Sequence, residues 1–138
     1  MNYPDLIRLY FERTTAFNSL WTLYVVVLGG LLAFSSLRKT PDRLTTALVS
    51  LLFIVFSYQN LGALRDTTAQ REAAVTLIGQ THPVSYPYTL DGTIHPVTYG
   101  NVLGFHLLSD VLTLAALWSM ELRRRRAANA ALAAAPMI

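Results

Sequence analysis

Cysteine is absent from the 138 residues, and charged residues make up only 14% of them. The absence of cysteine excludes disulfides, thiolate metal sites, iron–sulfur clusters and cysteine nucleophiles. A soluble domain carries about 25% charged residues, whereas 53% of the residues here are hydrophobic. The uncharged residues are grouped in long continuous runs. Such grouping is typical of a membrane protein rather than of a soluble domain with a large core. At this length we expect a single membrane domain over residues 1–138.

Three apolar runs predict three transmembrane helices. Residues 17–37 and 44–64 carry no charge, and residues 101–120 carry one acid, Asp110, and one histidine, His106. A helix of about 20 residues crosses a hydrocarbon core of about 30 Å. An aspartate at a helix centre costs about 2.5–3.5 kcal/mol, but the leucines around Asp110 outweigh that cost.

The basic residues predict the orientation. On one side of the membrane are the 38–43 loop and the tail, with Arg38, Lys39, Arg43, Arg123, Arg124, Arg125 and Arg126. The other side has four basic residues, Arg8, Arg13, Arg65 and Arg71, and five acids, Asp5, Glu12, Asp66, Glu72 and Asp91. Because basic loops stay in the cytoplasm, we expect an outside N-terminus and a cytoplasmic C-terminus. We expect the membrane to be the bacterial inner membrane.

The fold class expected is an all-α membrane protein with one small β-hairpin. Residues 3–16 predict an amphipathic helix that lies in the interface or runs into the first span, with a bend near Thr14 and Thr15. The outside loop, 65–100, contains Asp91-Gly92 between two near repeats. Asp-Gly is a strong signal for a hairpin turn, so we expect a hairpin over 82–99. The cytoplasmic tail, 121–138, either extends the third helix or frays.

His106 and Asp110 are the most unusual pair in the sequence. At positions i and i+4 they share one face of the third predicted helix. An ionisable pair inside a membrane suggests function, and Asp110 could orient His106 as a metal ligand or proton carrier. The plainer interpretation, which we favour, is an internal hydrogen bond that fixes helix packing, or a contact with another subunit.

Small and polar residues form stripes along the first two predicted helices. Small residues let membrane helices approach closely, and polar ones hydrogen-bond across the contact. The residues predicted to lie on these contact faces are Asn18, Thr22, Gly29, Ala33, Ser50, Ser57 and Asn60.

Two weaker patterns concern ligands. His82, His95 and His106 could together bind a metal, although His82 and His95 each precede a proline in a turn-rich segment. Arg123, Arg124, Arg125 and Arg126 could bind lipid headgroups, although the topology rule alone explains them. A pI near 9.5 does not indicate nucleic acid, because most basic residues flank apolar runs. The sequence leaves the cofactor question open.

The function that these patterns favour is a non-catalytic accessory or assembly subunit of a larger membrane complex, or a self-associating bundle. Its partners would be the bilayer and other membrane subunits or a second copy. One alternative is a channel or transporter component that uses His106 and Asp110. The other is a small membrane metal-binding protein or enzyme, but an enzyme needs more convergent groups than this pair supplies.

Overall fold

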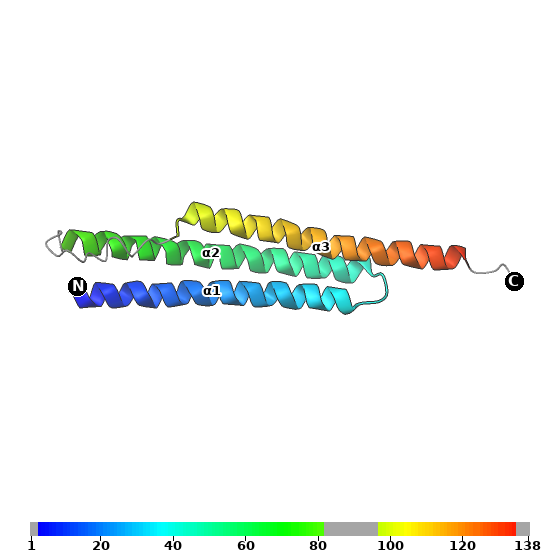
Figure 1. The fold of residues 1–138 in the computed structure, drawn as a ribbon, viewed down its shortest axis with the longest axis horizontal. Helices are drawn as coiled ribbons and strands as arrows, with labels where there is room; N and C mark the ends of the chain where they lie inside the picture. Colours follow the sequence, from blue (N-terminus) through cyan, green and yellow to red (C-terminus); the bar gives the residue numbers. More distant parts are fainter. Residues whose placement is uncertain (1–2, 82–96, 135–138) are drawn as a thin grey trace. The chain divides into compact units, whose positions relative to one another are not determined.

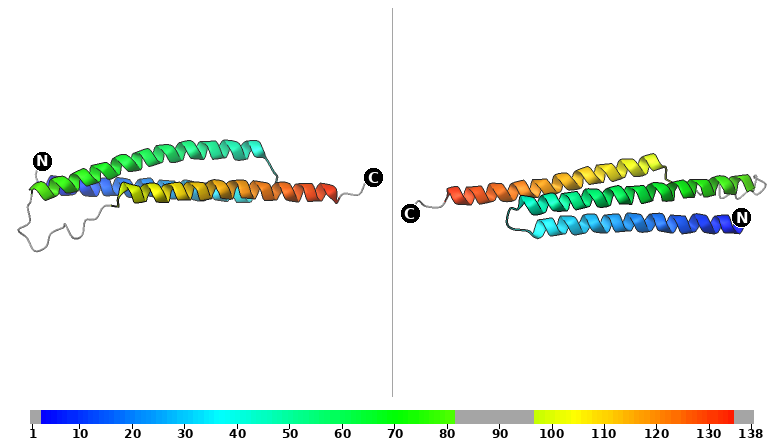
Figure 2. Two further views of the ribbon diagram at one scale, coloured as in Figure 1. Left: turned by 90° about the horizontal axis from the view of Figure 1, so that it is seen from above. Right: turned by 180° about the vertical axis from the view of Figure 1, so that it is seen from behind.

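The computed structural model describes residues 3–81 and 97–134, and nearly all of them are helical. Helix α1 runs over Tyr3–Leu37, α2 over Arg43–Thr81 and α3 over Tyr99–Ala133 (Figure 1; two further views in Figure 2). All three helices are long and apolar enough to cross a membrane. The all-α prediction and the prediction of three candidate spans are therefore confirmed.

The predicted β-hairpin over 82–99 is wrong. The described part of the chain contains no strand, and Tyr99 already belongs to α3. The Thr98 carbonyl oxygen accepts hydrogen bonds from the backbone amides of Asn101 and Val102, so this end of the segment caps a helix instead of joining a ladder. The prolines at 83, 87 and 96 have no N–H to donate to a ladder, which is a physical reason against a hairpin over this segment. Residues 82–96 lie outside the described residues.

Each helix is longer than the span predicted within it. Helix α1 is continuous through Thr14 and Thr15, where a bend was one expectation. The hydroxyls of both threonines donate to the carbonyl oxygens of Tyr10 and Phe11, one turn back. The second helix continues through the segment after 64 and the third through the alanine-rich tail to Ala133. Helices of 35 to 39 residues exceed the length needed to cross a bilayer core.

The chain divides into two compact units, each built from part of every helix. Unit 1 comprises Met1–Leu23 and Gln59–His106, and unit 2 comprises Tyr24–Tyr58 and Leu107–Ile138. The core of unit 1 is apolar and aromatic: Phe17, Leu64 and Val102 are buried, with Leu20 and Trp21 against them.

The interior of unit 2 is more polar than that of unit 1. Its largest buried apolar side chains, Tyr24, Phe53 and Leu117, lie among buried polar residues. Those polar residues are Ser35, Thr46, Ser50, Ser57, Thr113 and Glu121.

The outer surface of the helices is strongly apolar. In the most apolar 18-residue stretch of each helix, only 11% of the residues of α1, 28% of those of α2 and 22% of those of α3 are buried. Most side chains of these stretches therefore face outward. Val26 is 63% exposed, Leu52 68% and Val111 63%. A water-soluble protein rarely exposes so much contiguous apolar surface, whereas lipid would cover it. The structure is therefore compatible with an integral membrane protein in contact with the bilayer.

Candidate functional site

His106 is completely buried in unit 1, where it links α3 to α2. Its Nε2 lies 3.2 Å from Asn60 Oδ1, and Asn60 Nδ2 donates to the Leu20 carbonyl oxygen of α1 at 3.2 Å. A carbonyl oxygen can only accept, so the amide nitrogen must face Leu20 and the amide oxygen must face His106. His106 Nε2 therefore carries a proton and donates. The Trp21 ring lies beside the imidazole, with 5.9 Å between ring centroids.

Asp110 makes the corresponding contacts in unit 2. Its Oδ1 accepts from the Tyr24 hydroxyl of α1 at 2.8 Å, and its Oδ2 accepts from the Ser57 hydroxyl of α2 at 2.5 Å. Tyr24 is 1% exposed and Ser57 6%. Hydroxyl donors compensate a carboxyl group for the loss of water, and a buried carboxyl without them would be costly. Asp110 thus joins α3 to both other helices within this unit.

The predicted contact-face residues divide by helix. On α2, Ser50 and Ser57 are buried in unit 2 and Asn60 is buried in unit 1. On α1, Asn18, Thr22, Gly29 and Ala33 are all exposed. At about 100° per residue, these four lie roughly a third of a turn away from the buried series Phe17, Tyr24 and Ser35. The residues are therefore accessible on the single chain.

A charged cluster fastens α3 to the loop between α1 and α2 in unit 2. Glu121 is 1% exposed, and its carboxylate accepts from Arg125 Nε at 2.9 Å and from the Asp42 amide at 3.3 Å. Arg124 donates to the Ser35 carbonyl oxygen at 2.6 Å, at the end of α1 where backbone carbonyls lack helical partners. The cluster satisfies groups that a helix end would otherwise leave unpaired.

Asp42 begins α2 as an N-cap residue. Its Oδ1 accepts from the Thr45 amide at 3.1 Å, and its Oδ2 accepts from the Thr45 hydroxyl at 2.5 Å. These hydrogen bonds, with the Arg38 guanidinium 3.6 Å away, hold the pKa of Asp42 below its ordinary value. The arrangement is the usual one for an aspartate at a helix N-terminus.

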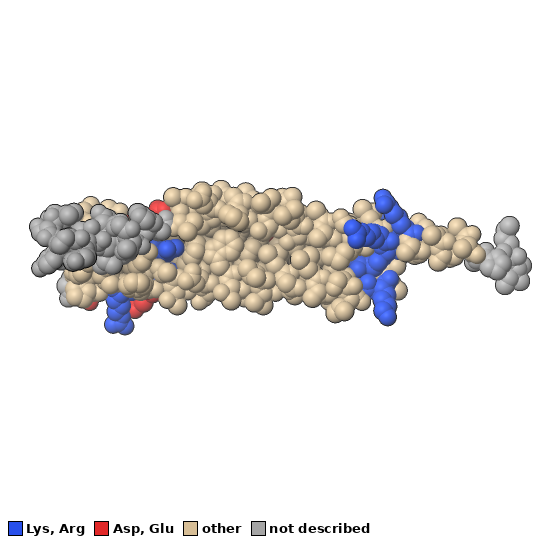
Figure 3. Space-filling view, in the orientation of Figure 1, with Lys and Arg blue, Asp and Glu red and all other residues tan. Residues whose placement is uncertain are grey.

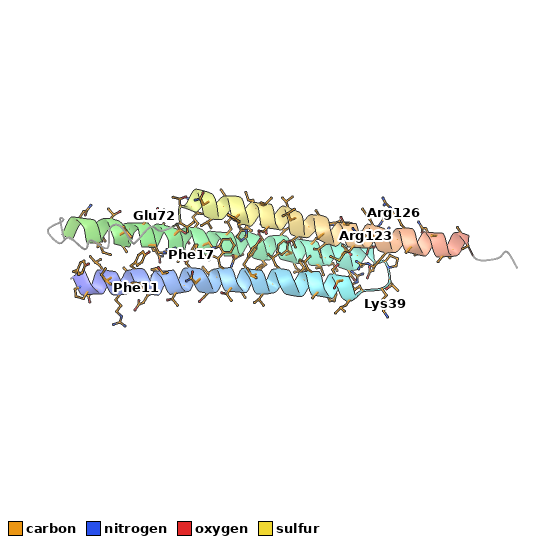
Figure 4. The ribbon with its side chains drawn as sticks, in the orientation of Figure 1. Phe11, Phe17, Lys39, Glu72, Arg123 and Arg126 are labelled. Carbon is orange, nitrogen blue, oxygen red and sulfur yellow. The ribbon has the colours of Figure 1, made fainter. Side chains whose placement is uncertain are left out.

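The four consecutive arginines of α3 have different surroundings. Arg124 and Arg125 pair with Glu121, whereas Arg123 and Arg126 are exposed. Figure 4 labels these two exposed arginines and Lys39, and the basic side chains of unit 2 gather around them (Figure 3). Arg123 and Arg126 are thus the exposed members of the set predicted to bind headgroups.

The structure leaves the proposed histidine metal site untested. His82 and His95 lie outside the described residues, and His106 is buried against Asn60. Within residues 3–81 and 97–134, no group of three or more metal-ligating side chains is close enough to hold an ion.

Sequence reasoning missed Tyr24 as a partner of Asp110, and Glu121 as the partner of Arg124 and Arg125. The signal for Tyr24 was the seven-residue spacing of Tyr10, Phe17 and Tyr24, which marks one buried face. The signal for Glu121 was its position three and four residues before Arg124 and Arg125, a spacing that favours ion pairs on a helix.

No protein-family model, curated protein or solved structure matches this chain.

Proposed function

We propose that the protein is a non-catalytic assembly subunit of the membrane, which binds either another membrane protein or a second copy of itself. The observation that carries this proposal is the use made of the two ionisable groups in the third predicted span. His106 is hydrogen-bonded to α2 in unit 1, and Asp110 to α1 and α2 in unit 2. Both groups hold helices together, which supports a structural role.

The hydrogen bonds of these groups also bear on the alternatives. Because His106 Nε2 donates to Asn60, only Nδ1 could offer a lone pair to a metal. The two oxygens of Asp110 accept from Tyr24 and Ser57. A proton path would need these groups to exchange partners with water or with an ion. The packing interpretation needs only the contacts already present.

The exposed stripe of α1 supplies a contact surface for a partner. Asn18, Thr22, Gly29 and Ala33 share one side of this helix and are exposed. A Cβ atom added to Gly29 would meet no atom within 4 Å in the described structure. Small residues allow close approach between membrane helices, and Asn18 can hydrogen-bond across a contact. This side of α1 is the surface that we propose the partner covers.

Gentle detergent extraction from the native membrane tests the proposal. The mass of the extracted particle should exceed that of one chain, 15.3 kDa, after the detergent is accounted for. A second membrane protein in fixed ratio, or a defined number of copies of this chain, would support an assembly role and identify the partner. A single chain that carries bound metal would refute the proposal in favour of a metal site.

A further inference from the structure

Two arginines of unit 1 have buried donors that no acceptor satisfies in the described residues. Arg71 of α2 is 6% exposed, and its Nε and Nη1 have no hydrogen-bond partner there. Arg13 of α1 has the same deficit at Nε. A buried guanidinium without an acceptor is costly, and such donors are usually paired. The deficit therefore points to an acceptor outside the described residues.

Arg71 lies against aromatic rings that orient its guanidinium. Its Cζ is 4.8 Å from the centroid of the Phe17 ring and 5.7 Å from that of Tyr10. Phe17 is labelled in Figure 4. Rings below a guanidinium stabilise its charge through cation–π interactions, but they use none of the N–H donors at its edge.

Arg13 brings a second positive charge to the same side of α1. It follows Tyr10 by three residues and precedes Phe17 by four, so the three share a helix face. The nearby acid Glu12 is already paired with Arg8 at 2.9 Å. Two guanidiniums would repel each other unless an anion lies near them. A phosphate group matches their donors well, because guanidinium binds phosphate oxygens in a bidentate fashion.

The height of these arginines along the helices points to a lipid. Arg13 is four residues before the apolar run 17–37, and Arg71 is seven residues after the run 44–64. At about 1.5 Å per residue, these offsets are roughly 6 and 10 Å. The headgroup layer extends several ångströms beyond the hydrocarbon core, and long arginine stems can reach back toward it. Both side chains are therefore at headgroup level.

We propose that Arg71 and Arg13 bind the phosphate group of an anionic phospholipid at the end of the bundle formed by unit 1. This site is distinct from the exposed arginines of α3, and it rests on the membrane location of the proposed function. It does not depend on any partner protein, so its failure and the failure of the assembly role can be distinguished.

The test measures phosphatidylglycerol binding to the purified full-length chain in detergent by native mass spectrometry. Arg71→Met removes the donors and keeps an apolar side chain over the rings. We expect one tightly held lipid on the wild type and at least about a tenfold loss of affinity in Arg71→Met, because a charged hydrogen bond is worth 1.5 kcal/mol or more. The matched control, Arg65→Met, changes an exposed arginine of the same helix and should bind as the wild type does.

Other probes separate the possible outcomes. Diacylglycerol carries the same chains without phosphate, and equal binding of it would overturn the proposal. Binding of inorganic phosphate but not of phosphatidylglycerol would overturn the lipid source. Unchanged lipid binding in Arg71→Met, with loss of a co-purifying protein instead, would assign the arginines to a partner's carboxylate. Circular dichroism checks that the variant is folded; if it is not, Arg13→Met tests the same site.

Discussion

At the scale of the residue, Asp110 is the acid within the third apolar run, where its carboxyl group needs hydrogen-bond donors. Its two oxygens accept from Tyr24 and Ser57, which belong to different helices. Replacing it with leucine would leave both hydroxyls without this acceptor. Interhelical hydrogen bonds in membranes average about 0.6 kcal/mol each, with a maximum near 1.7. Each hydrogen bond to Asp110 therefore contributes little to the free energy of unfolding, but the bonds from Tyr24 and Ser57 act together.

We expect Asp110→Leu to lower the free energy of unfolding in detergent by about 1–3 kcal/mol. Tyr24→Phe removes the hydrogen bond from Tyr24 to Asp110 but keeps that from Ser57, and should cost about 0.5–1.5 kcal/mol. Unfolding by a denaturing detergent, followed by circular dichroism, measures both values. If Asp110→Leu is as stable as the wild type, the hydrogen bonds do not hold the helices of unit 2 together.

At the scale of the element, the sequence predicted where helices exist better than where they end. The uncharged runs 17–37 and 44–64 identify α1 and α2 because nothing else explains 21 residues without charge. The helix predicted over 3–16 agrees with the start of α1 at Tyr3, but the apolar runs do not reveal that α2 continues to Thr81. Beyond the apolar run 44–64, helix propensity and tertiary contacts such as Arg71 over the Phe17 ring extend α2. A hydropathy pattern contains no information on such contacts.

The sequence indicated which residues of α3 make polar contacts, but not which residues of the other helices they meet. The i, i+4 spacing of His106 and Asp110 placed both on one face of α3, and their predicted role as a functional or packing pair stays a prediction. Which groups would meet them depends on the rotation of α1 and α2 about their axes. Within unit 1 that rotation brings Asn60 to His106, and within unit 2 it brings Tyr24 to Asp110. A single sequence does not fix such rotations.

The cap of α2 predicts a dependence on pH. The pKa of Asp42 is lower in the folded chain because the Thr45 hydroxyl and amide, and then Arg38, favour the carboxylate. Its stabilising effect is therefore complete above the ordinary aspartate pKa of about 3.9 and is lost as the pH falls through the lower folded value.

Asp42→Asn tests the sign of this effect, since asparagine caps a helix but does not titrate in this range. Between pH 6 and pH 3 (about two units above to one below the ordinary value), the wild type should lose more stability than the variant. The thermal midpoint in detergent at each pH gives the difference. Glu121, whose carboxylate accepts from the Asp42 amide, is present in both proteins and provides a common background. Equal losses would show that the cap does not contribute.

At the scale of the whole molecule, the distribution of charge predicts the orientation in the membrane. Unit 2 contains all seven basic residues of the 38–43 loop and the end of α3, and unit 1 contains the other four. By the positive-inside rule, we expect the C-terminus in the cytoplasm. A reporter fused after Ile138 that is active only in the cytoplasm should be active, and one active only outside should be silent. The reverse pattern would contradict the proposed topology.

A pair of glycine variants tests whether the exposed stripe of α1 binds a partner. A Cβ at either Gly29 or Gly30 meets no atom within 4 Å in the described structure, so Gly29→Leu and Gly30→Leu should both fold as single chains. Only Gly29 lies on the stripe with Asn18, Thr22 and Ala33, and Gly30 is about 100° further round the helix. The measurement is the amount of partner, or of second copy, that co-purifies with each variant from the membrane. We expect a loss of at least about tenfold for Gly29→Leu, because bulk is forced into a close helix contact, and little change for Gly30→Leu. Full recovery of the partner with Gly29→Leu would contradict this expectation.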